Sequence, residues 1–252
     1  MISKQNIELV RSLAKKKGRE ETGLFVAEGE KLVFDLLKTK LELSTLYFSA
    51  EAAALLKNFP DPAKSVKLSA KEMEQISSFK NPSNLLALFK IPTYQEAGLP
   101  AFEGLSLVLD GLQDPGNLGT IIRLADWFGI EDIYCSENCV DSFNPKCIQS
   151  TMGAIARVKV HYLDLPELLK EAVRQKFPVY GTYMDGENLY QTELLSQALI
   201  VMGSEGKGIS PQLSPYLTKK ISIPAFPVGD RELESLNVAL SAAIVCAEFR
   251  RR

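Results

Sequence analysis

Short apolar segments alternate with segments of helical periodicity throughout the second half of the chain. LSLVLD (105–110) and ALIVM (198–202) are nearly continuous apolar runs, which is typical of strands covered on both faces. Helices between such strands predict a doubly wound parallel sheet. In sheets of this kind ligands bind beyond the carboxyl ends of the strands, so polar residues that follow the strands are candidates for function.

This alternation continues to the carboxyl terminus. Helices are expected near 117–128, 145–152, 166–176, 210–217 and 235–252. Strands are expected near 105–110, 132–137, 156–162, 178–184, 198–203 and 219–224. The expected fold of this half is a parallel α/β sheet.

The first 95 residues show a shorter alternation of their own, which predicts a separate small α/β sandwich. The first segment, 4–19, has apolar residues at helical spacing and ends in a basic cluster, so one helix is expected there. Pro, Gly and polar residues without periodicity follow the last strand of this part. We therefore predict domains at 1–95 and 105–252, joined by a linker at 96–104.

Composition narrows the class of protein. Of the 252 residues, 46% are hydrophobic and 24% are charged, which is ordinary globular usage. The formal net charge of -2 means that a nucleic-acid partner would need a local basic patch. No apolar run approaches the ~20 residues of a membrane span. The amino terminus lacks the order of a secretory signal, so a cytoplasmic protein is expected.

The cysteines and the single histidine do not suggest a metal. Cys135, Cys139, Cys147 and Cys246 lack the spacing of a zinc knuckle, and His161 falls on an expected strand. We expect reduced, buried thiols and no metal site.

The first segment that could carry chemistry is 110–129. Its strand ends at Asp110, and Asn117 stands where the N-cap of the next helix is expected. Such a helix terminus is a natural place for polar or anionic groups. Arg123 interrupts an otherwise apolar helix, although by position alone a surface arginine that covers apolar neighbours explains it as well.

The second segment is the Gly-rich loop at 199–210, which contains Glu205 and Lys207. The residue after Lys207 is glycine, so the loop does not match the Walker pattern, and no dinucleotide fingerprint is present. A carboxylate in the loop suits a ligand with hydroxyl or ammonium donors. A turn without function would look similar.

The third segment, 221–244, contains Ser235, which is expected to cap the final helix. Small residues in that helix would let another helix of the same chain or of a second subunit approach closely.

Taken together and in this order, the three segments resemble the SpoU (TrmH-type) RNA 2′-O-ribose methyltransferases of the SPOUT superfamily. The matching motifs are Asn117-x5-Arg123, the loop from Gly203 to Gly208, and Ile223-Pro224 followed by Ser235-Leu236-Asn237. The resemblance covers about 105–252. The first part of the chain is similar to the L30e-like RNA substrate-binding domain often fused to this family.

The resemblance implies a trefoil knot near the carboxyl terminus, S-adenosylmethionine as cofactor, no metal, and a homodimer whose site is completed across the interface. It assigns Arg123 to activation of the ribose hydroxyl or to a phosphate clamp, because a guanidinium is a poor base. The resemblance also implies that four polar residues orient the hydroxyl and the cofactor: Asn117, Glu205, Ser235 and Asn237. It implies that five further residues contact the cofactor: Thr182, Gly203, Gly208, Ile223 and Leu236.

The expected partner is structured RNA, and the additional domain favours ribosomal RNA over transfer RNA. The RNA-binding residues are expected to be Lys15, Lys16, Lys17, Arg19, Lys80 and Asn81. Two alternatives stay open, namely a transfer RNA methyltransferase and an inactive RNA-binding assembly factor with the same fold. The loop at 225–234 is longer than is usual in the family, so Asp230 and Arg231 are candidates for substrate choice.

Overall fold

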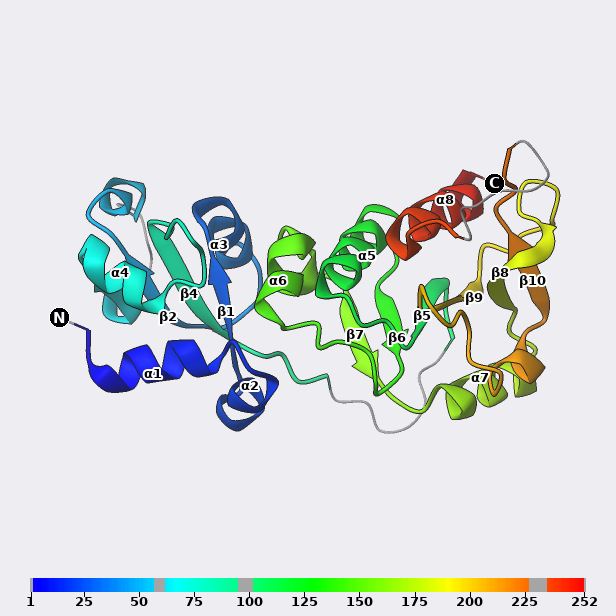
Figure 1. Cartoon of the computed structure of the whole chain (residues 1–252), viewed down its shortest axis with the longest axis horizontal. Coiled ribbons are helices and arrows are strands. Elements are labelled where there is room, and N and C mark those ends of the chain that lie inside the picture. The colour runs from blue at the N-terminus through cyan, green and yellow to red at the C-terminus, as the bar shows by residue number, and fades with distance from the viewer. Residues whose placement is uncertain (1, 57–61, 95–101, 227–234, 252) are drawn as a thin grey trace. The chain divides into compact units, whose positions relative to one another are not determined.

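The computed structural model describes residues 2–56, 62–94, 102–226 and 235–251. The chain divides into two compact units (Figure 1), one formed by 1–93 with 141–156 and the other by 94–140 with 157–252. The first unit thus includes a helical segment from the middle of the chain, which the linear boundaries 1–95, 96–104 and 105–252 did not anticipate. Those boundaries remain a proposal, and most of the expected linker lies outside the described residues.

The first unit contains a four-stranded mixed sheet in the order β1-β4-β2-β3. Its strands are β1 (Leu24–Glu28), β2 (Leu43–Phe48), β3 (Ser65–Lys67) and β4 (Leu85–Lys90). Its helices are α1 (Lys4–Ser12), α2 (Lys16–Thr22), α3 (Glu30–Leu37), α4 (Ala70–Ile76) and α6 (Pro145–Thr151), with 3-10 turns at Ala52–Leu56, Pro62–Lys64 and Ala154–Ala156. Val10, Tyr47, Met73 and Leu88 belong to a buried cluster between the sheet and the helices α1 and α4.

The expected single helix over 4–19 is two helices, α1 and α2. A Cβ on Gly18 would lie 2.3 Å from the backbone oxygen of Ser12. Glycine is therefore required where α2 folds back against the end of α1.

The second unit contains a six-stranded sheet in the order β10-β8-β9-β5-β6-β7, and every pairing in it is parallel. Its strands are β5 (Leu105–Asp110), β6 (Asp132–Cys135), β7 (Lys159–Tyr162), β8 (Val179–Asn188), β9 (Ala198–Gly203) and β10 (Lys219–Ser222). Its helices are α5 (Pro115–Trp127), α7 (Leu165–Arg174) and α8 (Val238–Arg251), with a 3-10 turn at Ser214–Tyr216. The predicted parallel sheet is confirmed, while the trefoil knot stays a prediction.

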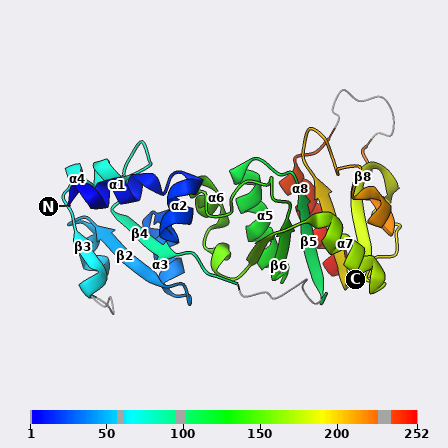
Figure 2. The same cartoon turned by 90° about the horizontal axis from the view of Figure 1, so that it is seen from below.

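Helices cover both faces of this sheet. In Figures 1 and 2, α7 lies on one face, and α5 and α8 lie side by side on the other. Leu168 and Leu169 of α7 pack against Val108, Leu199 and Val201 of the central strands. All six residues of β5 are buried, as its apolar sequence predicted. A strand enclosed on both sides keeps its backbone fixed, so the residues just beyond its end are held rigidly.

Two predicted helix caps are wrong by a few residues. Asp114, rather than Asn117, caps α5, and its side chain accepts a hydrogen bond from the backbone of Asn117. The last helix begins at Val238 and is capped by Asn237 rather than by Ser235. Both asparagine side chains therefore sit at helix amino termini, although only one of them caps.

The predicted role of Arg19 in RNA binding is wrong. The residue is only 2% exposed. Its Nε and Nη2 donate to Asp141 Oδ2 over 2.8 and 2.5 Å, and its Nη1 donates to the Leu13 carbonyl over 2.6 Å. A guanidinium whose donors are used inside the fold has no surface to offer to a phosphate, and Arg19 instead joins α2 to 141–156.

All four cysteines are buried thiols, as expected. Within the described part of the chain, no helix is long and apolar enough to cross a membrane.

The Arg19 interaction predicts a large stability effect. Arg19→Ala leaves the Asp141 carboxylate without its charged partner, so the free energy of unfolding should fall by about 3 kcal/mol in urea denaturation. Lys17→Ala, on the exposed side of the same helix, should change it by less than about 0.5 kcal/mol. Equal stability of the two variants would contradict a structural role for Arg19.

Candidate functional site

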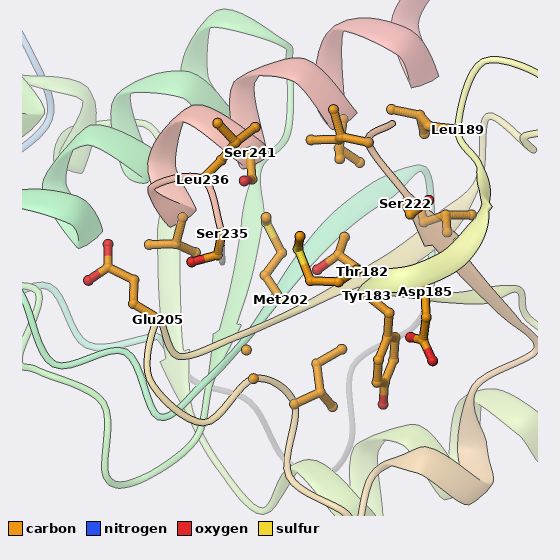
Figure 3. Close-up of a pocket in the computed structure, with 18 of the residues that line it drawn as sticks. Thr182, Tyr183, Asp185, Leu189, Met202, Glu205, Ser222, Ser235, Leu236 and Ser241 are labelled. Atoms are coloured by element: carbon orange, nitrogen blue, oxygen red, sulfur yellow. The ribbon is translucent and has the colours of Figure 1, made fainter. Parts of the chain in front are cut away.

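A cavity of about 690 Å³ opens beside the carboxyl ends of β9 and β10. Met202 and Ile221 from these strands and Val245 from α8 form apolar parts of its wall. Glu205 and Asp185 supply carboxylates at opposite ends, as Figure 3 shows. A cavity at this edge of a parallel sheet is where a ligand is expected.

Glu205 is the centre of a hydrogen-bonded cluster beside this cavity. Asn117 Nδ2 and Asn237 Nδ2 donate to Glu205 Oε1 over 2.8 and 2.9 Å. Asn237 Nδ2 also lies 3.1 Å from Asn117 Oδ1, which closes a triangle between the three side chains. The three segments selected from the sequence therefore meet at one point. We call these residues the Asn-Glu-Asn cluster.

Two helix amino termini hold the Asn-Glu-Asn cluster. Asp114 Oδ1 accepts from the Asn117 backbone over 2.8 Å in the first turn of α5. Asn237 Oδ1 accepts from the backbone nitrogens of Ala239 and Leu240 at the start of α8. Because helix amino termini carry partial positive charge, both favour the Glu205 carboxylate. No described residue donates to its second oxygen, Oε2, so this atom can accept from a ligand.

The Gly-rich loop that carries Glu205 is shaped by its own backbone. Ser204 and Gly208 exchange backbone hydrogen bonds of 3.2 and 2.9 Å. A Cβ on Gly203 would lie 2.0 Å from the Gly208 carbonyl carbon, and Gly208 has a φ of +65°. Both positions therefore require glycine because of the close turn itself, and the turn presents Glu205 to the cavity.

Most residues assigned by the family resemblance lie where that assignment needs them. Those that line the cavity are Thr182, Gly203, Gly208, Ile223, Leu236, Glu205 and Ser235. Asn117 and Asn237 join them through Glu205. The roles of these residues remain predictions, whereas their convergence is a property of the structure.

Arg123 does not join this group within one chain. It lies about 240° around α5 from Asn117, because six residues of a helix turn by that amount. Its side chain is exposed, does not line the cavity, and has no hydrogen-bond or ion-pair partner among the described residues.

Part of the cavity wall was not predicted from the sequence motifs. Tyr183, Met184 and Asp185 in β8 and Phe226 after β10 line the cavity. The sequence offered one signal, Gly186, which follows the expected strand 178–184 and lies inside the observed β8, since glycine within a strand often marks a bulge. Asp230 and Arg231 lie outside the described residues.

The predicted RNA-binding residues other than Arg19 are exposed in the first unit. Lys16 and Lys17 lie 3.8 and 3.7 Å from the carboxylates of Glu20 and Glu21 along α2. Lys15 precedes this helix, and Lys80 and Asn81 lie in an exposed bend. Exposed ion pairs of this kind are weak, so the lysines can exchange them for phosphates.

Among the described residues, no group of three or more histidine, cysteine or carboxylate side chains is arranged to hold a metal ion.

The dual role of Asn237 predicts two separable losses of stability. Asn237→Asp keeps a good helix cap but places a second carboxylate beside Glu205, so the free energy of unfolding should fall by about 1 kcal/mol. This loss should disappear in a Glu205→Gln background, where one of the two repelling charges is absent. Asn237→Ala should instead lose about 1 kcal/mol in both backgrounds through the missing cap. Urea denaturation measures both, and a loss in Asn237→Asp that is the same in both backgrounds would contradict the observed cluster.

Both parts of this chain match known protein families, and similar proteins align with nearly its whole length. The SpoU rRNA Methylase family matches residues 104–247, and the MRM3-like substrate binding domain matches residues 4–87. An uncharacterized tRNA/rRNA methyltransferase of Synechocystis sp. is 30% identical over 98% of this chain and 90% of that protein. The 23S rRNA (guanosine(2553)-2′-O)-methyltransferase RlmP of Bacillus subtilis is 28% identical over 98% of this chain and 96% of that protein.

Solved structures of similar proteins have the same fold as this chain. A putative RNA methyltransferase of the TrmH family from Porphyromonas gingivalis superposes with a TM-score of 0.88 at 40% identity, over 100% of this chain and 99% of that one. An AdoMet-bound rRNA methyltransferase from Sinorhizobium meliloti has a TM-score of 0.81 at 26% identity, over 100% and 97% of the two chains. The resemblance inferred from the sequence motifs is confirmed. Since the SpoU family match spans more than half of the residues of this chain, the chain belongs to the SpoU rRNA methylase family.

Proposed function

We propose that this protein transfers a methyl group from S-adenosylmethionine to a ribose 2′-hydroxyl of structured RNA, and that the RNA is ribosomal. The observation that carries the proposal is the Asn-Glu-Asn cluster at the edge of the 690 Å³ cavity. The named activity of RlmP and the AdoMet bound to the S. meliloti protein support it. The match to an MRM3-like substrate binding domain and the name of RlmP favour ribosomal over transfer RNA.

The cavity fits this cofactor chemically. S-adenosylmethionine combines a flat base with a net positive charge, and the cavity combines apolar wall residues such as Met202 and Ile221 with two carboxylates, Asp185 and Glu205. Its Gly-rich turn places a carboxylate at the edge of the cavity, which suits a cation and would oppose a pyrophosphate. Backbone around Gly203, Ile223 and Leu236, together with Thr182, would hold the cofactor.

The chemistry needs placement more than activation by the protein, because the bound cofactor supplies a methyl group already activated by its sulfonium. Glu205 Oε2 accepts a hydrogen bond from the ribose hydroxyl and so orients its oxygen. Asn117 and Asn237 fix the carboxylate through Oε1, so that it does not reorganise during reaction. Arg123 holds an adjacent phosphate of the RNA, and that phosphate or a water molecule takes the hydroxyl proton when the oxygen receives the methyl group.

The active protein is a homodimer whose site is completed by Arg123 of the second copy. Within one chain Arg123 points to no described partner and does not line the cavity. Exposed apolar residues lie on the same two neighbouring helices: Trp127, four residues after Arg123 in α5, is 84% exposed, and Leu240 of α8 is 60% exposed. A second copy placed over α5 and α8 would cover these residues and bring an arginine to each cavity.

Lys15, Lys16, Lys17, Lys80 and Asn81 form the surface that contacts RNA in the first unit. With reduced cysteines and a ribosomal substrate, the protein works in the cytoplasm.

Arg123→Ala should lower the rate of methyl transfer by about 10²- to 10⁴-fold. The affinity for S-adenosylmethionine should stay nearly unchanged, because the proposed role of Arg123 is toward the RNA and not toward the cofactor. Transfer of labelled methyl groups to ribosomal RNA and mapping of 2′-O-methyl positions measure the first quantity, and calorimetry measures the second. Arg174→Ala, an exposed helical arginine outside the cavity, is the matched control. Full activity of Arg123→Ala would exclude the proposed role.

A shared site makes two inactive variants complementary. A heterodimer of Arg123→Ala and Glu205→Ala, purified with two different tags, contains one intact site and should recover about half of the wild-type rate. If Arg123 served its own chain, both sites would be damaged and the heterodimer would stay inactive.

The lysine cluster should set part of the salt dependence of RNA binding. Replacing Lys15, Lys16 and Lys17 together by Ala should reduce the slope of log affinity against log salt by roughly one unit per lost phosphate contact. Lys170→Ala, an exposed lysine of α7, serves as control. An unchanged slope in the triple variant would reject this surface.

A further inference from the structure

The pairing of strand β8 with β10 is interrupted for five residues at the wall of the cavity. Its parallel pairing with β10 matches Lys220 with Gly181, but the next residue, Ile221, matches Glu187. Residues 182–186 therefore bulge out of the ladder, and four of them line the cavity. Bulges often redirect side chains toward a functional site. We call 182–186 the β8 bulge.

Contacts at its two ends and at Tyr183 fix the β8 bulge. Thr182 Oγ1 donates to the Val201 carbonyl over 3.2 Å at its start. A Cβ on Gly186 would lie 2.5 Å from the Ile221 carbonyl carbon, so only glycine lets the chain rejoin β10 at its end. The Tyr183 hydroxyl pairs with Ser214 Oγ at 3.0 Å, and the Lys220 ammonium lies 4.6 Å from its ring centroid. The bulge is thus a built part of the wall.

Asp185 is the ionisable carboxylate that this bulge presents. It lines the cavity, and it has no hydrogen-bond or ion-pair partner among the described residues. Figure 3 places it at the end of the cavity away from Glu205, with Thr182 and Met202 between them. Glu205 differs because its Oε1 already accepts two amide hydrogen bonds. Asp185 therefore has all of its acceptor capacity available for a ligand.

We propose that Asp185 is a cofactor-binding residue that accepts hydrogen bonds from a donor of S-adenosylmethionine remote from the reacting methyl group. This rests on the proposed function, which puts the methyl group beside the Asn-Glu-Asn cluster. Away from the sulfur, the cofactor has two strong donor groups close to its centre, the ribose diol and the α-ammonium. A carboxylate binds either one well. A carboxylate at each end of the cavity also matches the net positive charge of the cofactor.

The test measures affinity by calorimetry with S-adenosylhomocysteine, which has both donor groups and no methyl group to transfer. Asp185→Asn and Asp185→Ala should each weaken its binding by about 10-fold or more, as expected for loss of a charge-assisted hydrogen bond. Glu187→Gln, two residues along the same strand and outside the cavity lining, should bind as the wild type does. Equal thermal unfolding midpoints of the ligand-free proteins would show that the bulge is intact.

A second ligand separates the two donors. 5′-Methylthioadenosine has the ribose diol but no α-ammonium. A similar loss of its affinity in Asp185→Asn places the partner in the adenosine half, where the ribose diol is the stronger donor, and loss restricted to S-adenosylhomocysteine identifies the ammonium. Both results support the proposal. Affinities within twofold of the wild type for both ligands and both variants would overturn it. If the wild-type protein itself failed to bind S-adenosylhomocysteine, the proposed function would fail first.

Discussion

The Glu205 carboxylate is the interaction on which the arrangement of this site depends. It receives an amide from the first turn of α5 and another from the residue that caps α8. Each helix brings a partially positive end to the same anion, so the two helices, the Gly-rich turn and three strand ends are tied to one point. Asn237 links the cluster to the fold most directly, because one atom of its amide caps a helix while another binds Glu205. The Asn237 side chain therefore contributes both to the stability of the fold and to the geometry of the site.

The second organising feature is a departure from regular sheet structure. The parallel ladder of the second unit is regular across its central strands and breaks where β8 meets β10. That break turns a strand into a cavity wall, and Gly186 makes it sterically possible. The sheet can tolerate such a local interruption at one side because its central strands are buried between the helices on both faces. The cavity is thus built from the one irregular edge of an otherwise regular sheet.

The first unit shows how charge in a sequence can serve two purposes. Lys15, Lys16, Lys17 and Arg19 form one basic run in the sequence, yet only the lysines remain on the surface. Arg19 turns inward and is neutralised by Asp141, which is 122 residues away. A helix places neighbouring residues on different faces, so a basic run is divided between solvent and interior. The partner that buries an arginine can lie anywhere in the chain.

Local pattern was sufficient for most of the elements and for the class of fold, although the expected helix over 4–19 is two helices and the one near 210–217 is a 3-10 turn at Ser214–Tyr216. Continuous apolar strands predicted the parallel sheet, and motif order predicted which polar residues converge, because the carboxyl ends of parallel strands meet at one edge. Helix starts were misplaced by a few residues, since Asp114 and Asn237 compete with nearby Asn117 and Ser235 for the same capping role. The tertiary structure alone decided that Arg19 is buried, that Arg123 stands apart from the cluster of its own chain, and that 182–186 leave the sheet. Each of these depends on contacts between residues distant in sequence, and no local periodicity encodes such contacts.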